Sequence, residues 1–458
     1  MSEKMSKKMS EKTTPRRNSV VTKVLVLPGV ALTLLFASNN IFTGNSSLFN
    51  RAISAEPVTQ KTKKVPAMRE RVYSQLARAQ KTADDGDIKA GLAILDEVKD
   101  RLTSLNSYER AMLFNFYAFI HYGNDNVVAA IDNFELVVKE QTGISDALYI
   151  STQFSLAQLF MQQQDYKRSE QALLAWQSAN NKALTADQYV LFAQVYYQQQ
   201  DFINSLMAID NAIREQHKNG KVAKENWLIL KRAAHYELQQ PELVTAVLED
   251  MVRLFNKPQY WLQLSAMYGE IGEEAKQLAV MEAAFQAGFV EQQDDIMTLA
   301  QLYIYHQLPY KSAVLMQQAM DVGRLTVNER RLELLAQAYM LAKEEHKALP
   351  VLQQASQISE SGKFDAQLAQ LYVNLEMWQK AIVSAEQAIA RGNIDNPGDM
   401  HLAQGMSYFN LQQFEQSLIA FEHAQSIDES ANMAKQWRSY VQREQGYQLQ
   451  LVQLTDSE

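Results

Sequence analysis

Apolar residues recur along residues 66–443 with the three- and four-residue spacing of a helix face. The clearest stretch is residues 260–268, where Trp261, Leu264, Ser265 and Tyr268 fall on one side of a helix. Weaker copies of this stretch recur roughly every 35 residues. Ten copies can be counted, beginning near Val72, Ala111, Ile150, Ala186, Glu225, Pro258, Gln293, Glu329, Gly362 and Gly398.

Each copy predicts two helices joined by a tight turn. The first helix carries a small residue and, three positions later, an aromatic one, as in Ala193 and Tyr196. Turn-forming residues such as Gln200 and Asp201 follow, and the second helix again carries a small residue, such as Ser205. Small residues let the paired helices approach closely, and the large residues beside them fill the space to the next pair.

This pattern resembles the tetratricopeptide (TPR) repeat, a helix–turn–helix unit of about 34 residues. The resemblance implies an all-α fold: a right-handed TPR superhelix (α-solenoid) of about ten repeats with a C-terminal capping helix. Proteins of this kind usually bind other proteins and seldom catalyse reactions.

Two regions depart from the regular pattern. The fifth copy has Lys231, Arg232 and His235 at positions that are usually apolar or small, with Pro241 in its turn, so we expect irregular geometry there. Residues 447–454 partly alternate with period two. They are expected to form either a strand added to a partner or a frayed end.

Composition supports a mostly helical chain, because Gly and Pro number only 16 and 9 among 458 residues. The absence of Cys excludes disulfides, thiolate catalysis and Cys-based zinc sites, and it is compatible with an oxidising compartment. Residues 1–55 carry eight Lys/Arg and two acids, a net charge of +6, which leaves −14 for the rest of the chain's total of −8. An acidic body without a basic stripe argues against nucleic-acid binding.

The N-terminus has the order of a secretory signal, a basic segment followed by the apolar residues 24–37. The apolar part is shorter than the ~20 residues of a spanning helix, so a cleaved signal peptide and an uncleaved signal anchor both remain open. A disordered cytoplasmic N-terminus is the third alternative. The predicted parts are a signal peptide or anchor (1–38), a linker (39–65), the TPR stack (66–431), and the capping helix with a tail (432–458).

No catalytic or metal-binding motif is found. The seven His form no H-x-x-x-H or H-E-x-x-H pair, and the phosphate-binding and nucleophile-elbow motifs are missing. Acidic pairs such as Asp294 and Asp295 lie at turns or helix starts, where they are expected to act as caps. We therefore expect no enzyme activity, catalytic residue, metal, cofactor or small-molecule substrate.

The predicted binding site is the groove lined by the first helices of the repeats. Its ninth position is repeatedly Gln, whose amide can both donate and accept hydrogen bonds along an extended peptide. Aromatic and Met neighbours would contact apolar side chains. The alternative is that these Gln only form a solvated, helix-favouring face. The predicted groove residues are Phe154, Gln158, Met161, Gln194, Tyr197, Gln301, Tyr305, Gln337, Met340 and Gln370.

Several segments in this order resemble a narrower group, the TPR protein that accompanies TonB, ExbB and ExbD in Gram-negative bacteria. The segments are KTKKVPAMRERVY at 61–73, NFYAFI at 115–120, KENWL at 224–228, YWLQLSAMYGE at 260–270, LYIYH at 302–306 with PYK at 309–311, and NPG at 396–398. The resemblance covers residues 61–443.

This second resemblance implies a periplasmic accessory of the TonB energy-transduction system, which drives uptake of nutrients such as iron through the outer membrane. The expected partner is TonB, ExbB or ExbD, and membrane contact is expected only through residues 24–37 if the signal is uncleaved. The alternative is a TPR adaptor for another envelope process, such as polysaccharide export or pilus or secretion assembly.

Overall fold

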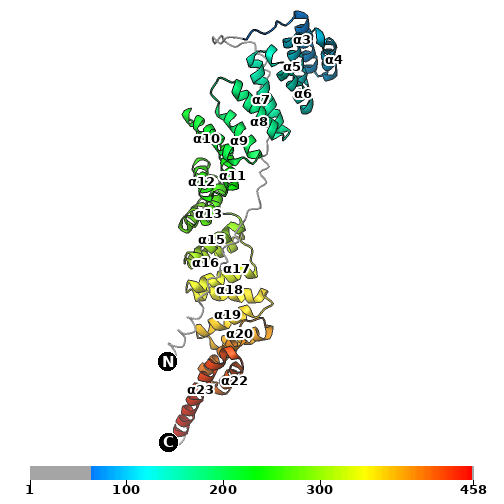
Figure 1. Ribbon diagram of the computed structural model, residues 1–458. Helices are drawn as coiled ribbons and strands as arrows, with labels where there is room; N and C mark the ends of the chain where they lie inside the picture. The colour runs from blue at the N-terminus through cyan, green and yellow to red at the C-terminus, as the bar shows by residue number, and fades with distance from the viewer. Residues whose placement is uncertain (1–62, 456–458) are drawn as a thin grey trace. The chain divides into compact units, whose positions relative to one another are not determined.

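The computed structural model describes residues 63–455, and within this range every regular element is a helix. The described residues form 21 α-helices and two short 3-10 helices, η1 (Leu102–Ser104) and η2 (Gln141–Gly143) (Figure 1). The helices pack pairwise in chain order, from α3 with α4 to α21 with α22, and α23 packs against α22. This arrangement of ten hairpins and a final helix confirms the predicted all-α repeat architecture.

The chain divides into two compact units between residues 181 and 182. The first unit contains three hairpins, and their helices are α3 (Glu70–Asp84), α4 (Ile88–Lys99), α5 (Ser107–Gly123), α6 (Val127–Lys139), α7 (Asp146–Gln162) and α8 (Tyr166–Ala179). A single continuous superhelix over residues 66–431 stays a prediction.

The second unit contains seven hairpins and the final helix. Its helices are α9 (Ala186–Gln198), α10 (Phe202–Lys218), α11 (Glu225–Glu237), α12 (Pro241–Phe255), α13 (Pro258–Glu270), α14 (Glu274–Gln286), α15 (Gln293–Tyr305), α16 (Pro309–Asp321), α17 (Glu329–Leu341), α18 (Glu345–Ile358), α19 (Lys363–Asn374), α20 (Trp378–Arg391), α21 (Pro397–Asn410), α22 (Phe414–Gln425) and α23 (Asp428–Thr455).

The same turn joins the two helices of every hairpin. One residue in each turn has a positive φ, which reverses the chain within a few residues. In the first four hairpins the next residue is Asp or Asn, and its side chain accepts a hydrogen bond from the backbone of the second helix. The positive-φ residues are Gly86, Asp125, Gln164, Gln200, Gln239, Gly272, Gln307, Lys343, Glu376 and Gln412.

Small residues lie where the two helices of a hairpin cross. The Ser205 hydroxyl donates a hydrogen bond to the Ala193 carbonyl oxygen, at 2.8 Å. Ser169 and Ser417 make the same bond to the carbonyl twelve residues earlier. At Gly405 a Cβ atom would lie 2.7 Å from the Phe421 ring, so only glycine fits. The predicted pairing of small residues between the helices is thus confirmed.

Large side chains fill the spaces between hairpins. Leu264, Ser265 and Tyr268 of α13 are buried, and the partly buried Trp261 packs against the core that α14 to α20 share. The Trp261 ring also lies near Phe289, with ring centroids 6.5 Å apart. The clearest repeat signature of the sequence therefore consists of packing residues.

The fifth hairpin is more regular than expected. Helices α11 and α12 are uninterrupted, and Pro241 is the first residue of α12, where its missing N–H costs no hydrogen bond. Its polar residues have partners: Lys231 pairs with Asp210 at 2.7 Å, and the His235 ring lies 2.8 Å from the Gln240 amide oxygen. The expectation of irregular geometry is wrong because these side chains are satisfied without breaking a helix.

The final helix covers the end of the second unit. The Trp437 ring stacks on Phe421 with centroids 5.8 Å apart, and Val441 is buried. Helix α23 continues to Thr455, so residues 447–454 are neither a strand nor a frayed end, and that prediction is wrong. Gln and Leu are both good helix formers, and their alternation does not outweigh the helix that precedes them.

The predicted signal segment (1–38) and nearly all of the predicted linker (39–65) lie outside the described residues. Within residues 63–455, no helix combines the length and apolar character needed to span a bilayer.

Candidate functional site

The predicted groove residues all lie on the first helices of their hairpins, but the structure exposes them unequally. Gln301, Tyr305, Gln337 and Met340 are exposed, whereas Phe154, Gln158, Gln194, Tyr197 and Gln370 are partly buried. Met161 is only 6% exposed and belongs to the core. The exposed members come from α15 and α17, which are the first helices of consecutive hairpins.

Phe154 and Met161 offer little contact surface in the first unit. The Phe154 ring packs on Trp176, with ring centroids 5.0 Å apart. Its surface is thus used partly within its own hairpin, and buried Met161 contributes to packing.

Tyr197 in the second unit is also committed to packing. Its ring meets Phe202 edge-on, with centroids 5.3 Å apart. Burial, with a smaller contribution from the nearby Glu237 carboxylate, raises the pKa of Tyr197, so its hydroxyl stays protonated and able to donate.

The face of α15 and α17 is defined by Gln301, Tyr305, Gln337 and Met340. Gln301 and Tyr305 are four residues apart, and Gln337 and Met340 are three apart, so each pair shares one side of its helix. The Tyr305 hydroxyl donates to Glu274 Oε1 at 2.5 Å, which holds the ring at the end of α15. Each helix thus presents one amide next to one large apolar or aromatic side chain.

An open pocket of about 400 Å³ lies between the α15–α16 and α17–α18 turns, which follow α15 and α17 in the chain. This pocket was not predicted, although the repeat copies differ in sequence at the residue before the second of these turns. The last residue of α17 is the exposed Leu341, whereas the equivalent residues of α19 and α21 are Asn374 and Asn410. The pocket is lined by Gln307, Leu308, Pro309, Tyr310, Lys311, Ala342 and Glu344.

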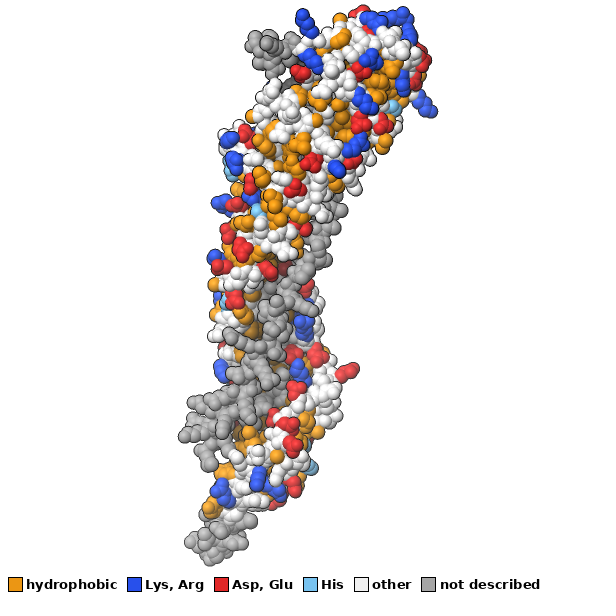
Figure 2. Space-filling view, in the orientation of Figure 1, with side chains coloured by type: hydrophobic (Ala, Val, Ile, Leu, Met, Phe, Trp, Pro, Cys, Tyr) orange, Lys and Arg blue, Asp and Glu red, His pale blue; other side chains and the backbone are white. Residues whose placement is uncertain are grey.

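Charge is mixed on the visible surface. In the view of Figure 2, Lys and Arg side chains are interspersed with Asp and Glu among the described residues, and no basic stripe is visible on that face. Within residues 63–455, no group of three or more His, Cys, Asp or Glu could hold a metal ion.

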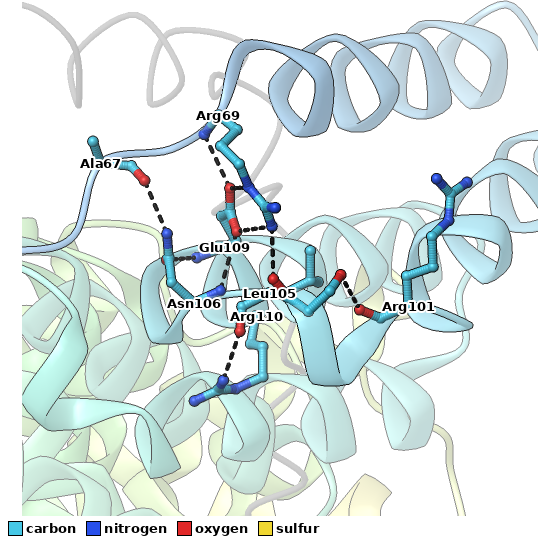
Figure 3. Close-up of polar contacts among 8 residues, drawn as sticks. Ala67, Arg69, Arg101, Leu105, Asn106, Glu109 and Arg110 are labelled. Atoms are coloured by element: carbon cyan, nitrogen blue, oxygen red, sulfur yellow. Dashed lines mark hydrogen bonds and ion pairs between the residues drawn. The ribbon is translucent and has the colours of Figure 1, made fainter.

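Glu109 is the most strongly perturbed carboxylate among the described residues, and its contacts show a structural role. It is buried on α5 and accepts hydrogen bonds from Arg69 Nη2 at 2.6 Å, Arg69 Nε at 2.8 Å and the backbone N–H groups of Arg69 and Asn106 at 3.0 Å (Figure 3). These donors, Arg69 foremost, lower the pKa of Glu109 to about 2. The cluster joins the start of α3 to the start of α5, so it stabilises the packing of the first two hairpins.

The comparisons with known proteins identify the repeat. The family model described as "Tetratricopeptide repeat" matches residues 398–430, which contain most of α21, all of α22 and the start of α23. No curated protein matches the chain. The chain therefore contains a tetratricopeptide repeat at residues 398–430, and the other hairpins of the described residues have the same two-helix plan.

Solved structures show partial likenesses. The TPR protein YrrB, whose structure is described as having an unusual peptide-binding site, is 14% identical and covers 42% of this chain and 96% of its own, with a TM-score of 0.34. A TPR protein from Parabacteroides merdae is 13% identical and covers 56% of this chain and 98% of its own, with a TM-score of 0.29. The TPR2AB domain of yeast Sti1, in complex with pHSP90, is 16% identical and covers 56% of this chain and 98% of its own, with a TM-score of 0.28.

Proposed function

We propose that this chain is a non-enzymatic scaffold that binds a protein partner on the face of α15 and α17. The observation that carries the proposal is the exposure of Gln301, Tyr305, Gln337 and Met340 on consecutive hairpins. The other predicted groove residues are partly or fully buried, so among the predicted groove positions these two helices offer a partner the most side-chain surface.

The chemistry of the face suits an extended polypeptide segment. The amides of Gln301 and Gln337 can each donate to a peptide carbonyl and accept from a peptide N–H. Tyr305 and Met340 supply apolar surface beside them, and the flexible Met side chain adapts to different partners. Main-chain hydrogen bonds would hold the segment, and its side chains would determine specificity.

We further propose that the partner belongs to the TonB–ExbB–ExbD system and that the chain works in the periplasm. The support is the ordered sequence resemblance over residues 61–443, together with the basic and apolar order of residues 1–37. If residues 24–37 stay uncleaved, they would anchor the chain to the inner membrane.

The test replaces Gln301 and Gln337 together by Glu, with Gln194 as a third site, and captures partners by crosslinking in intact cells. Capture of TonB, ExbB or ExbD by the native chain and its loss in the variant are expected, because carboxylates cannot donate to peptide carbonyls. A matched control replaces three exposed Gln of second helices by Glu and should capture the same partner as the native chain. The three residues are Gln318, Gln354 and Gln387.

Two results would contradict these proposals. Unchanged capture by the groove variant would overturn the assignment of the face. Capture of a pilus, secretion or polysaccharide-export subunit in place of TonB components would overturn the assignment to the TonB system and support the adaptor alternative.

A further inference from the structure

The last residue of each first helix in the second unit lies at the same edge of its hairpin. Equivalent residues of consecutive repeats follow one another along the same edge of a stack, and we call the six residues from α11 to α21 the edge row. All six residues of this edge row from α11 to α21 are exposed. In chain order they are Glu237, Glu270, Tyr305, Leu341, Asn374 and Asn410.

The middle of the edge row is apolar. Tyr305 is 52% exposed and Leu341 is 53% exposed, and the pocket of about 400 Å³ opens at the turns that follow them. Leu308 and Tyr310 of that pocket are exposed as well. Single exposed apolar residues are ordinary, but a contiguous group around a pocket is typical of an interaction site.

The acidic members of the edge row lie on one side of this apolar group only. Glu237, Glu242 and Glu270 are exposed, and no Lys or Arg among the described residues forms a salt bridge with them. Glu273, at the next turn, has only Lys276 as a partner, at 3.5 Å. Lys276 is the one cation beside the four acidic residues of the α11–α12 and α13–α14 turns, so this acidic flank has a net negative charge.

Glu274 joins the acidic flank to the apolar group. It is the first residue of α14, and its Oε1 accepts the hydrogen bond from the Tyr305 hydroxyl at 2.5 Å. The other side of the pocket is different, because Asn374 and Asn410 continue the row without charge. The edge row therefore changes from negative through apolar to neutral polar, while Glu344 in the pocket and the exposed Glu376 of the α19–α20 turn lie beside the row.

We propose that this edge binds a partner segment in which a run of Lys or Arg precedes or follows a large apolar side chain. The inference rests on the proposed scaffold function and specifies the chemistry of its partner. The apolar side chain enters the pocket at the α15–α16 and α17–α18 turns, and the cations lie against Glu237 and Glu270. Exposed charge pairs add little affinity each, but they select the partner and speed its approach.

The proposal is tested with the full chain and fluorescent peptides, with binding measured by polarisation. The probe has about 12 residues, which span about 40 Å when extended, and carries four Lys next to a Trp and a Leu. A second peptide has Glu in place of each Lys, and a third keeps the Lys but has Ala in place of Trp and Leu. Only the first peptide is expected to bind well, and raising NaCl from about 0.05 to about 0.5 M should weaken its binding.

Variants of the chain locate the binding. The double variant Glu237→Gln and Glu270→Gln should lower the affinity for the first peptide about three- to tenfold, because charge pairing is lost. Leu341→Asn, which copies the equivalent residue of α19, should also weaken it. The matched control is Asn374→Ala with Asn410→Ala, at the same positions of other hairpins, and should leave the affinity unchanged.

Equal binding of the Lys and Glu peptides, binding by neither, or indifference to the Glu237 and Glu270 variants would overturn this inference. The proposed scaffold function is tested separately by partner capture in cells. Capture that is lost with Gln301→Glu and Gln337→Glu but unchanged with Glu237→Gln and Glu270→Gln would overturn the inference and support the function. Capture that is indifferent to both pairs would overturn both.

Discussion

Replacing Glu109 by Gln should loosen the first two hairpins at neutral pH. The native carboxylate is fully buried and accepts three hydrogen bonds from Arg69 and one from the backbone of Asn106. Gln is nearly the same size, but its amide has no charge and has only one acceptor oxygen. The variant thus leaves donors of Arg69 without a partner and keeps the packing volume.

The size of the effect follows from the pKa of Glu109, which the donors lower from 4.5 to about 2. At 1.36 kcal/mol per pKa unit, this difference corresponds to about 3 kcal/mol of stability. Arg69 is 53% exposed, so solvent screening reduces the expected loss to about 1–2 kcal/mol. Because the folded pKa is the lower one, the contribution is complete above pH 4.5 and is lost as the pH falls toward 2.

Hydrogen exchange of the α3 and α5 amides measures this local stability. At pH 7 the variant should exchange faster than the native chain, and the gap should close as the pH falls below 4. A matched control is Glu140→Gln, because Glu140 pairs with Arg110 at 2.7 Å but is partly exposed. It should change protection less than Glu109→Gln does. Equal protection of the native and Glu109→Gln chains at pH 7, or a gap that persists unchanged at pH 2–3, would refute the reasoning.

Two further predictions concern packing within the hairpins of the second unit. Gly405→Ala should destabilise α21 and α22 by about 1–3 kcal/mol, because its Cβ would lie 2.7 Å from Phe421, as faster exchange of both helices would show. Gly446→Ala is the control and should stabilise α23, because a Cβ at residue 446 would have no atom within 4 Å. Destabilisation by both changes would contradict the packing argument. Ser205→Ala should lower stability by about 1 kcal/mol in urea unfolding, because its buried hydroxyl bonds to a carbonyl at 2.8 Å. Ser312→Ala is the control, since the Ser312 hydroxyl is buried without a hydrogen-bond partner. An equal loss of stability in both variants would contradict the stabilising role of the Ser205 hydrogen bond.

The hairpins could be predicted from the sequence because each depends on a local pattern. The predicted copies beginning near Ala186, Glu225, Pro258, Gln293 and Glu329 start at the same residues as α9, α11, α13, α15 and α17. Small residues twelve apart determine where the two helices cross, and that spacing is visible in the chain. The division of the chain after residue 181 has no such local signal.

The exposure of individual groove residues could not be predicted in the same way. Met161 and Met340 occupy the same position of their copies, yet the first is 6% exposed and the second 37%. Their exposure depends on how neighbouring helices cover each position, and the period of one helix contains no information about that. The pocket next to Leu341 combines residues of two hairpins, so it too becomes visible only in three dimensions.

The most direct test of the central claim is site-specific photo-crosslinking in cells that make the full chain. A photoreactive residue replaces Gln337 on the exposed face of α17, and in a second strain it replaces Gln354, which is exposed on the second helix of the same hairpin. The account predicts a covalent adduct with one partner polypeptide from position 337 and none from position 354. Equal adducts from both positions, or none from position 337, would contradict it.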